Sequence, residues 1–171
     1  MENVTPGQEV PELVVDTVNG MIWNLRDQLP QNFTMVVFYR GLHCPVCKTY
    51  LEELNSKIEQ FRDRGINVIC ISANTGSLAE KTLINWDIEK LTIGHDFSME
   101  NAREWGLYVS NGISDNEPDI FFEPALFLIR PDNTLYAASI QSMPFARPKF
   151  DELLKSIDFV LKEEYPARGE A

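Results

Sequence analysis

Residues 33–65 form the stretch that decides the fold: FTMVVFYRGLHCPVCKTYLEELNSKIEQFRDRG. Its first seven residues are almost all apolar, which is typical of a strand buried on both faces of a sheet. Gly41 ends this strand, and beyond Val46 the apolar residues recur at the three- and four-residue intervals of one helical face. Gly65 stands where a helix commonly ends. The stretch therefore predicts a strand and a helix with Cys-Pro-Val-Cys, residues 44–47, at their junction.

The rest of the chain continues this alternation. Asn19-Gly20 favours a type I′ turn, so an N-terminal β-hairpin is expected around it. Ser77 and Ser98 are the expected caps of two helices, and Pro148 suits the first turn of the last helix. The further strands expected are 66–72, 91–93, 125–130 and 135–140, and the further helices 77–89, 98–105 and one from about 148. This order predicts one α/β domain over 1–171, with a central mixed sheet flanked by helices and an N-terminal hairpin extension.

Composition excludes several classes of partner. The 171 residues are 44% apolar and carry a net charge of −11, with a pI near 4.6. Such an acidic chain repels a phosphate backbone, which argues against nucleic acid and against an anionic membrane surface. No apolar run exceeds five residues, and no basic residue precedes Arg26, so we expect neither a membrane span nor a signal peptide. We therefore expect a cytoplasmic protein.

The three cysteines are too few for a disulfide scaffold, so the pair Cys44 and Cys47 is expected to be catalytic or metal-binding rather than structural. One alternative is half of a zinc site, but a structural zinc needs four ligands and only Cys70, His43 and His95 remain. Cys70 lies between isoleucines in an expected central strand, where a buried thiol packs as a small apolar group. We expect no metal and no cofactor. A second alternative is that Cys44 and Cys47 are buried cysteines that lie close together by chance. This does not explain why the pair falls at the strand–helix junction.

The position of the pair suits thiol chemistry. Cys44 is expected just before the helix, where unpaired amides and the helix dipole favour a thiolate. One turn brings Cys47 back beside it, ready to attack a mixed disulfide formed on Cys44. Pro45 fits the helix start, and an imidazolium on His43 would lower the thiol pKa further. We expect Cys44 to face solvent as the nucleophile and Cys47 to be partly covered.

These residues resemble a known family. Residues 38–47, FYRGLHCPVC, followed by an amphipathic helix, resemble the thioredoxin superfamily and, more narrowly, the peroxiredoxin-like branch of the alkyl hydroperoxide reductase/thiol-specific antioxidant (AhpC/TSA) family. Residues 102–107 and 123–129 resemble that group's helix end and its cis-proline strand. The resemblance implies a thioredoxin-like fold and an antioxidant enzyme, with a cis peptide bond before Pro124 facing the dithiol. It also implies a thiol, disulfide or peroxide substrate and an external thiol reductant such as thioredoxin or glutathione, and it allows a homodimer.

The chain departs from the peroxiredoxin pattern P-x-x-x-T-x-x-C. The final cysteine of that pattern is Cys47, but Arg40 takes the place of the proline and Cys44 that of the threonine. Pro124 replaces the late-strand arginine. The groups that polarise a peroxide bond are thus partly missing, and Arg40 or Arg147 would have to supply the positive charge.

Three functions follow from these observations. The first is a thiol–disulfide oxidoreductase in which Cys44 attacks and Cys47 resolves. The second is a thiol-dependent peroxidase, with Cys47 as the peroxidatic residue. The third is a non-catalytic redox-sensing or thiol-binding module on the same fold. Peroxide consumption and insulin-disulfide reduction separate the first two, and the third predicts turnover in neither assay.

Overall fold

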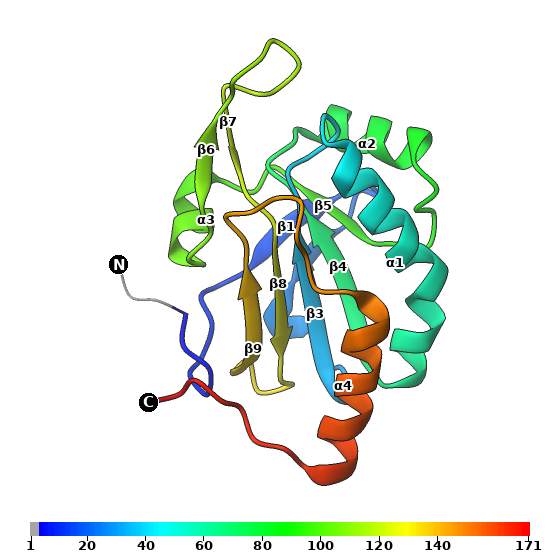
Figure 1. Cartoon of the computed structure of the whole chain (residues 1–171). Coiled ribbons are helices and arrows are strands. Elements are labelled where there is room, and N and C mark those ends of the chain that lie inside the picture. The colour runs from blue at the N-terminus through cyan, green and yellow to red at the C-terminus, as the bar shows by residue number, and fades with distance from the viewer. Residues whose placement is uncertain (1–3) are drawn as a thin grey trace.

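The computed structural model describes residues 4–171, and its main feature is a seven-stranded mixed sheet (Figure 1). The strand order is β2-β1-β5-β4-β3-β8-β9. These strands are β1 (Val14–Thr17), β2 (Ile22–Asn24), β3 (Phe33–Phe38), β4 (Ile66–Ile71), β5 (Ile93–His95), β8 (Ala125–Ile129) and β9 (Leu135–Ile140). The central β3 pairs in parallel with β4 and antiparallel with β8. The α/β mixed sheet predicted from the sequence is confirmed.

Helices cover both faces of this sheet. They are the 3-10 turn η1 (Leu25–Asp27) and the helices α1 (Pro45–Asp63), α2 (Gly76–Asn85), α3 (Met99–Glu104) and α4 (Phe150–Glu163). Figure 1 shows α1 and α4 on one side of the sheet and α3 on the other. Alternate side chains of β3 point to opposite faces of the sheet. Met35 and Val37 pack in the core beneath α1 and α4. Val36 and Phe38 pack in the core beneath α3.

The first helix forms because one of its faces is apolar throughout. Leu51, Leu54, Ile58 and Phe61 are all buried against the sheet. Burial of each such side chain contributes about 1.5–3 kcal/mol, which outweighs the mixed helix propensity of the exposed positions. Gly65 follows with a positive φ of 71° and closes the helix, as predicted.

Some element ends differ from the predictions. Thr75, not Ser77, caps α2, since its Oγ1 accepts the Leu78 N–H, and the helix ends at Asn85. Pro148 lies before the cap of α4 rather than in its first turn. In the N-terminal hairpin only Gly20 has a positive φ, of 81°. The loop is therefore a type I turn with one left-handed residue, closed by the Thr17 N–H donating to the Met21 carbonyl.

A second, two-stranded sheet of β6 (Val109–Asn111) and β7 (Ile120–Phe122) was not predicted from the sequence. Each strand has three residues, too few for a recognisable alternation. The hairpin projects beyond the main sheet near the start of α1 (Figure 1). Within residues 4–171 no helix combines the length and the apolar character needed to cross a membrane.

Candidate active site

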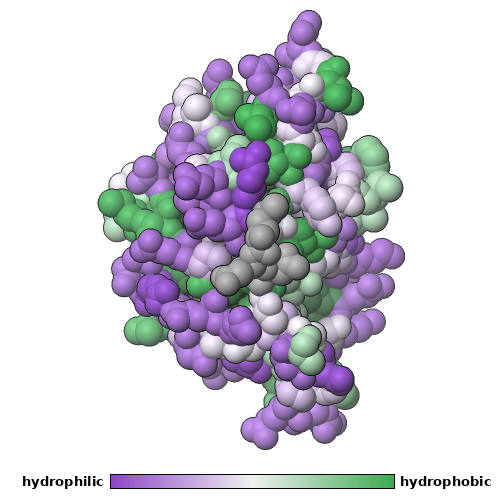
Figure 2. All heavy atoms as spheres, turned by 90° about the vertical axis from the view of Figure 1, so that its left-hand side faces the viewer, coloured by the Kyte–Doolittle hydropathy of each residue, from purple (hydrophilic) through white to green (hydrophobic). Residues whose placement is uncertain are grey.

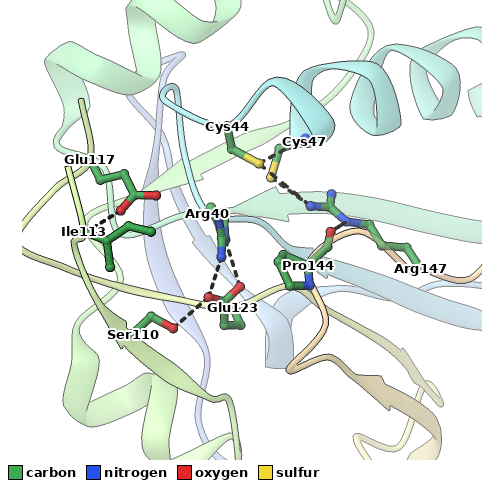
Figure 3. Close-up of polar contacts among 9 residues, drawn as sticks. All are labelled: Arg40, Cys44, Cys47, Ser110, Ile113, Glu117, Glu123, Pro144 and Arg147. Atoms are coloured by element: carbon green, nitrogen blue, oxygen red, sulfur yellow. Dashed lines mark hydrogen bonds and ion pairs between the residues drawn. The ribbon is translucent and has the colours of Figure 1, made fainter. Parts of the chain in front are cut away.

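The dithiol lies at the amino end of α1, directly after the loop that leaves β3 (Figure 3). Cys44 is the N-cap residue, with extended backbone angles of −103° and 103°, and its Sγ accepts the Cys47 N–H at 3.2 Å. The reactive sulfur thus occupies the position that a Ser or Asp oxygen commonly takes at a helix start.

Two residues hold the loop in front of Cys44. Gly41 has a φ of 134°, and a Cβ there would lie 2.6 Å from Asn74 Nδ2, so only glycine fits. The Leu42 N–H donates to Asn74 Oδ1 at 2.8 Å, which ties the loop to the buried segment after β4. Asn74 was not predicted as a site residue, because no sequence motif connects it with the cysteines.

The pKa values of the two thiols are shifted in opposite directions. The Cys47 thiol donates to Cys44, and this hydrogen bond, with the Cys47 amide and Arg147, lowers the pKa of Cys44 from 9.0 to about 6 against the opposing effect of burial. Burial and the same hydrogen bond raise the pKa of Cys47. At neutral pH, Cys44 is therefore a thiolate and Cys47 a protonated donor. The expectation that Cys44 faces solvent is wrong: it is 4% exposed and Cys47 0%, since α1 and the β9–α4 loop cover both.

Arg147 supplies positive charge to the dithiol from the β9–α4 loop. Its Nη2 lies 3.2 Å from Cys47 Sγ and 3.9 Å from Cys44 Sγ (Figure 3). The guanidinium is held by donation from Nε to the Pro144 carbonyl and by the Tyr50 ring, 5.2 Å away. Arg40 and Arg147 were the two expected sources of positive charge, and the fold places Arg147 beside the sulfurs.

Arg40 is engaged elsewhere. Its Nε and Nη2 donate to the two carboxylate oxygens of Glu123 at 2.8 and 2.7 Å, and Ser110 Oγ donates to the same carboxylate (Figure 3). The Arg40 guanidinium also lies over the Phe121 ring. Burial would raise the pKa of Glu123, but the hydrogen bonds from Arg40 and Ser110 outweigh it and the pKa is lowered. Glu123 opens the stretch 123–129 noted in the sequence, but its pairing with Arg40 beside the site was not predicted.

The expected role of His43 is not supported. Both ring nitrogens are buried without a hydrogen-bond partner, and the ring packs on Phe121 at 4.9 Å. Burial lowers the pKa of His43 below its ordinary 6.5, so the ring is neutral at neutral pH. It supplies no imidazolium to Cys44.

The expectation of a cis bond before Pro124 is wrong, because no peptide bond among the described residues is cis. The chain is extended here: the Glu123 N–H donates to the Tyr108 carbonyl, and the Pro124 carbonyl accepts the Gln141 N–H. These ladder bonds carry β7 directly into β8, which a trans bond allows. Pro124 was expected to face the dithiol and substrate because of a cis bond, and without that bond this expectation loses its basis.

Cys70 lies apart from this chemistry. It is 0% exposed in β4, and burial raises its pKa. His95 pairs with Asp96 at 2.6 Å. In the described part of the chain, no three His, Cys, Asp or Glu side chains are grouped so that they could hold a metal ion.

A low-pKa thiolate at the start of the helix after a central strand, with a second thiol one turn on, defines a thiol oxidoreductase of the thioredoxin-like class. The AhpC/TSA family model matches residues 6–138, and the chain belongs to the AhpC/TSA family. No curated protein sequence matches the chain significantly.

Solved structures share the fold at low sequence identity. A cysteine-to-serine mutant of peroxiredoxin 6 of Arenicola marina is 20% identical, with a TM-score of 0.76 over 94% of this chain and 75% of that one. A peroxiredoxin-like protein from Aquifex aeolicus is 18% identical, with a TM-score of 0.74 over 94% and 90%. AhpC of Enterococcus faecalis is 16% identical, with a TM-score of 0.75 over 96% and 98%. The thioredoxin-like peroxiredoxin fold implied by the resemblance is confirmed.

Proposed function

We propose that the protein is a thiol–disulfide oxidoreductase with an antioxidant role, in which Cys44 is the nucleophile and Cys47 the resolving cysteine. The observation that carries this proposal is the double donation from Cys47 to Cys44 Sγ, by its amide at 3.2 Å and by its thiol. It leaves one sulfur ionised and places the second sulfur beside it, still protonated.

The reaction then has two exchange steps. The Cys44 thiolate attacks one sulfur of a substrate disulfide, the substrate S–S bond breaks, and the departing thiolate takes a proton from solvent. The Cys47 thiol next loses its proton and attacks Cys44 Sγ, which releases the second substrate thiol and forms the Cys44–Cys47 disulfide. The substrate gains two electrons and two protons. An external thiol reductant such as thioredoxin or glutathione returns the pair to the dithiol.

Arg147 supports both steps. In the reduced protein its guanidinium lies closer to Cys47 than to Cys44. Negative charge must appear on Cys47 during resolution, although burial disfavours it there. A cation 3.2 Å away stabilises that charge, so Arg147 is proposed as the group that makes a buried thiol a competent second nucleophile.

A thiol peroxidase is the second candidate, favoured by family membership and by the guanidinium at the sulfurs. In this reaction a thiolate attacks a peroxide oxygen, the O–O bond breaks, an alcohol or water leaves, and the partner thiol condenses with the sulfenic acid to release water. Cys47 is poorly suited to begin it, being fully buried with a raised pKa. A homodimer remains a proposal from the family resemblance.

Trapping of the mixed disulfide tests the assignment. The Cys47→Ser variant is expected to accumulate a mixed disulfide with insulin on Cys44, while Cys44→Ser traps none. Cys70→Ser is the matched control and should behave as wild type, because Cys70 is fully buried. Mass spectrometry locates the bond. If Cys44→Ser instead retains peroxide-driven sulfenic acid formation at the wild-type rate, Cys47 is the peroxidatic residue and the peroxidase assignment replaces this one.

A further inference from the structure

Two loops with exposed apolar side chains flank the dithiol. On one side the β6–β7 loop carries Ile113, which is 91% exposed, and on the other the β9–α4 loop carries Met143 and Phe145, 56% and 74% exposed. Figure 3 shows Ile113 and Arg147 on opposite sides of Cys44. Apolar surface near the top of the molecule, where the hairpin projects, lies among hydrophilic side chains (Figure 2). Single exposed apolar residues are ordinary, but a set beside a reactive sulfur indicates an interaction surface.

The hairpin is fixed to the residues that precede Cys44. Phe121 of β7 packs on the His43 ring at 4.9 Å and lies 5.0 Å beneath the Arg40 guanidinium. At the other end the Ile113 N–H donates to Glu117 Oε2 at 2.8 Å, which closes the tip of the loop. Ile113 is therefore presented on an anchored support at a set position relative to the dithiol.

The limited exposure of Cys44 bears on whether the substrate is a small disulfide or a polypeptide. Cys44 is only 4% exposed, with Arg147 of the β9–α4 loop against its sulfur and Phe121 of β7 against the neighbouring His43, so a disulfide must approach it past these two segments. A small disulfide would leave Ile113 and Phe145 in water. A polypeptide whose disulfide enters between the loops would bury both side chains, and each buried apolar side chain favours association.

The charged residues around the dithiol indicate which net charge a substrate should carry. The hairpin tip, residues 112–119, contains Asp115, Glu117 and Asp119 and no Lys or Arg, in a chain of net charge −11. Three of the nearby cations are engaged: Arg40 pairs with Glu123, Arg147 faces the sulfurs, and Lys48 pairs with Glu52. Lys149 is an exposed cation on the opposite loop. The side of the entrance formed by the hairpin is thus acidic and attracts positive charge.

We propose that the substrate is a disulfide within a basic polypeptide segment, held between the β6–β7 loop and the β9–α4 loop with apolar residues against Ile113 and Phe145. This inference rests on the proposed oxidoreductase function and specifies its substrate class. The exchange step is the one given above: Cys44 breaks the peptide S–S bond and Cys47 releases the reduced peptide.

Single-turnover reduction by the pre-reduced full chain tests this. The substrates are hydroxyethyl disulfide and two cyclic disulfide peptides that share apolar flanks and differ only in carrying lysines or glutamates. We expect the lysine peptide to react about tenfold faster than the glutamate peptide, with the ratio falling at high salt. Asp115→Asn with Asp119→Asn should lower this ratio severalfold. Ile113→Ser should slow both peptides and leave hydroxyethyl disulfide unchanged.

Leu29→Ser is the matched control, since Leu29 is 88% exposed and precedes β3, at the end of that strand away from the dithiol. Equal rates for the two peptides, or an Ile113→Ser variant that behaves like Leu29→Ser, overturn the docking proposal while hydroxyethyl disulfide reduction still supports the oxidoreductase. Failure of the wild type to reduce any of the three disulfides overturns the proposed function itself.

Discussion

The guanidinium of Arg147 lies 3.2 Å from the sulfur of Cys47, although the two residues are 100 positions apart. The chain has Pro124 where the peroxiredoxin pattern places an arginine on a late strand, and here a cation reaches the dithiol from the loop before α4 instead. The electrostatics of the site therefore depend on an irregular segment, in which the Arg147 guanidinium is held by the Pro144 carbonyl and the Tyr50 ring.

Removal of this charge should make Cys44 less acidic. Arg147 lowers the pKa of Cys44 both through its charge and through a hydrogen bond, so Arg147→Gln is expected to raise that pKa. The rate of iodoacetamide alkylation at pH 6 should fall about tenfold. Arg147→Lys should recover part of the rate, and Lys149→Gln, which removes a nearby exposed cation, should leave it unchanged. An unaltered alkylation profile in Arg147→Gln would show that the guanidinium does not act on the thiolate.

The Cys47 thiol should be the main source of the acidity of Cys44. The wild-type protein is expected to titrate with a midpoint near the pKa of about 6, seen as thiolate absorbance or as the pH dependence of alkylation. Cys47→Ala removes the donor, so the midpoint should move up toward the ordinary thiol value. Cys47→Ser keeps a donor and should stay nearer the wild type. Identical midpoints for the two variants would contradict the hydrogen-bond explanation.

Gly41 should be the least replaceable glycine of the site. Gly41→Ala forces a Cβ to within 2.6 Å of the Asn74 side chain at a φ of 134°, which should cost about 2–3 kcal/mol in the free energy of unfolding. Gly20→Ala is the matched control: it has a positive φ but nothing within 4 Å, so only about 1 kcal/mol is expected. Urea unfolding measures both. Equal losses would mean that the close contact with Asn74 is relieved without cost.

The Arg40–Glu123 pair should contribute to stability in a pH-dependent way. Because the folded-state pKa of Glu123 is lowered, its contribution is complete above the unfolded-state pKa and is lost as pH falls through the folded-state value. Glu123→Gln leaves Arg40 unpaired and should cost about 3 kcal/mol at neutral pH while flattening the acid limb. Asp151→Asn, which breaks an exposed pair with Lys57, should cost far less. A loss for Glu123→Gln no larger than that of the control would rule out a role for the pair in stability.

Around the dithiol, the sequence correctly predicts the features that depend on local information. Apolar periodicity, Gly65 and the cysteine spacing all lie within residues 33–65, and together they specify β3, the dithiol and α1. Cys70 was recognised as a core residue from its neighbours alone. Each of these features depends on side chains that are adjacent along one strand or one helical turn.

At the site, what could not be predicted depends on contacts between distant segments. His43 is neutral because Phe121 covers it from a hairpin whose strands are too short to recognise. The bond before Pro124 is trans because hydrogen bonds on both sides continue the strand, and these come from residues 108 and 141. The pairing of Glu123 with Arg40 spans 83 positions. No pattern in a single sequence encodes such partners.

The sulfur of Cys44 has two duties, since the atom that attacks a substrate also closes the amino end of α1 by accepting the Cys47 N–H. A thiolate is a stronger acceptor than a sulfur bound in a disulfide, so the first turn of the helix is held more firmly in the reduced protein. Because this interaction is stronger with the thiolate than with the disulfide, it favours the dithiol and makes the oxidised pair easier to reduce. The hydrogen bond that fixes the start of α1 therefore also contributes to the redox balance of the pair, together with the Cys47 thiol and Arg147.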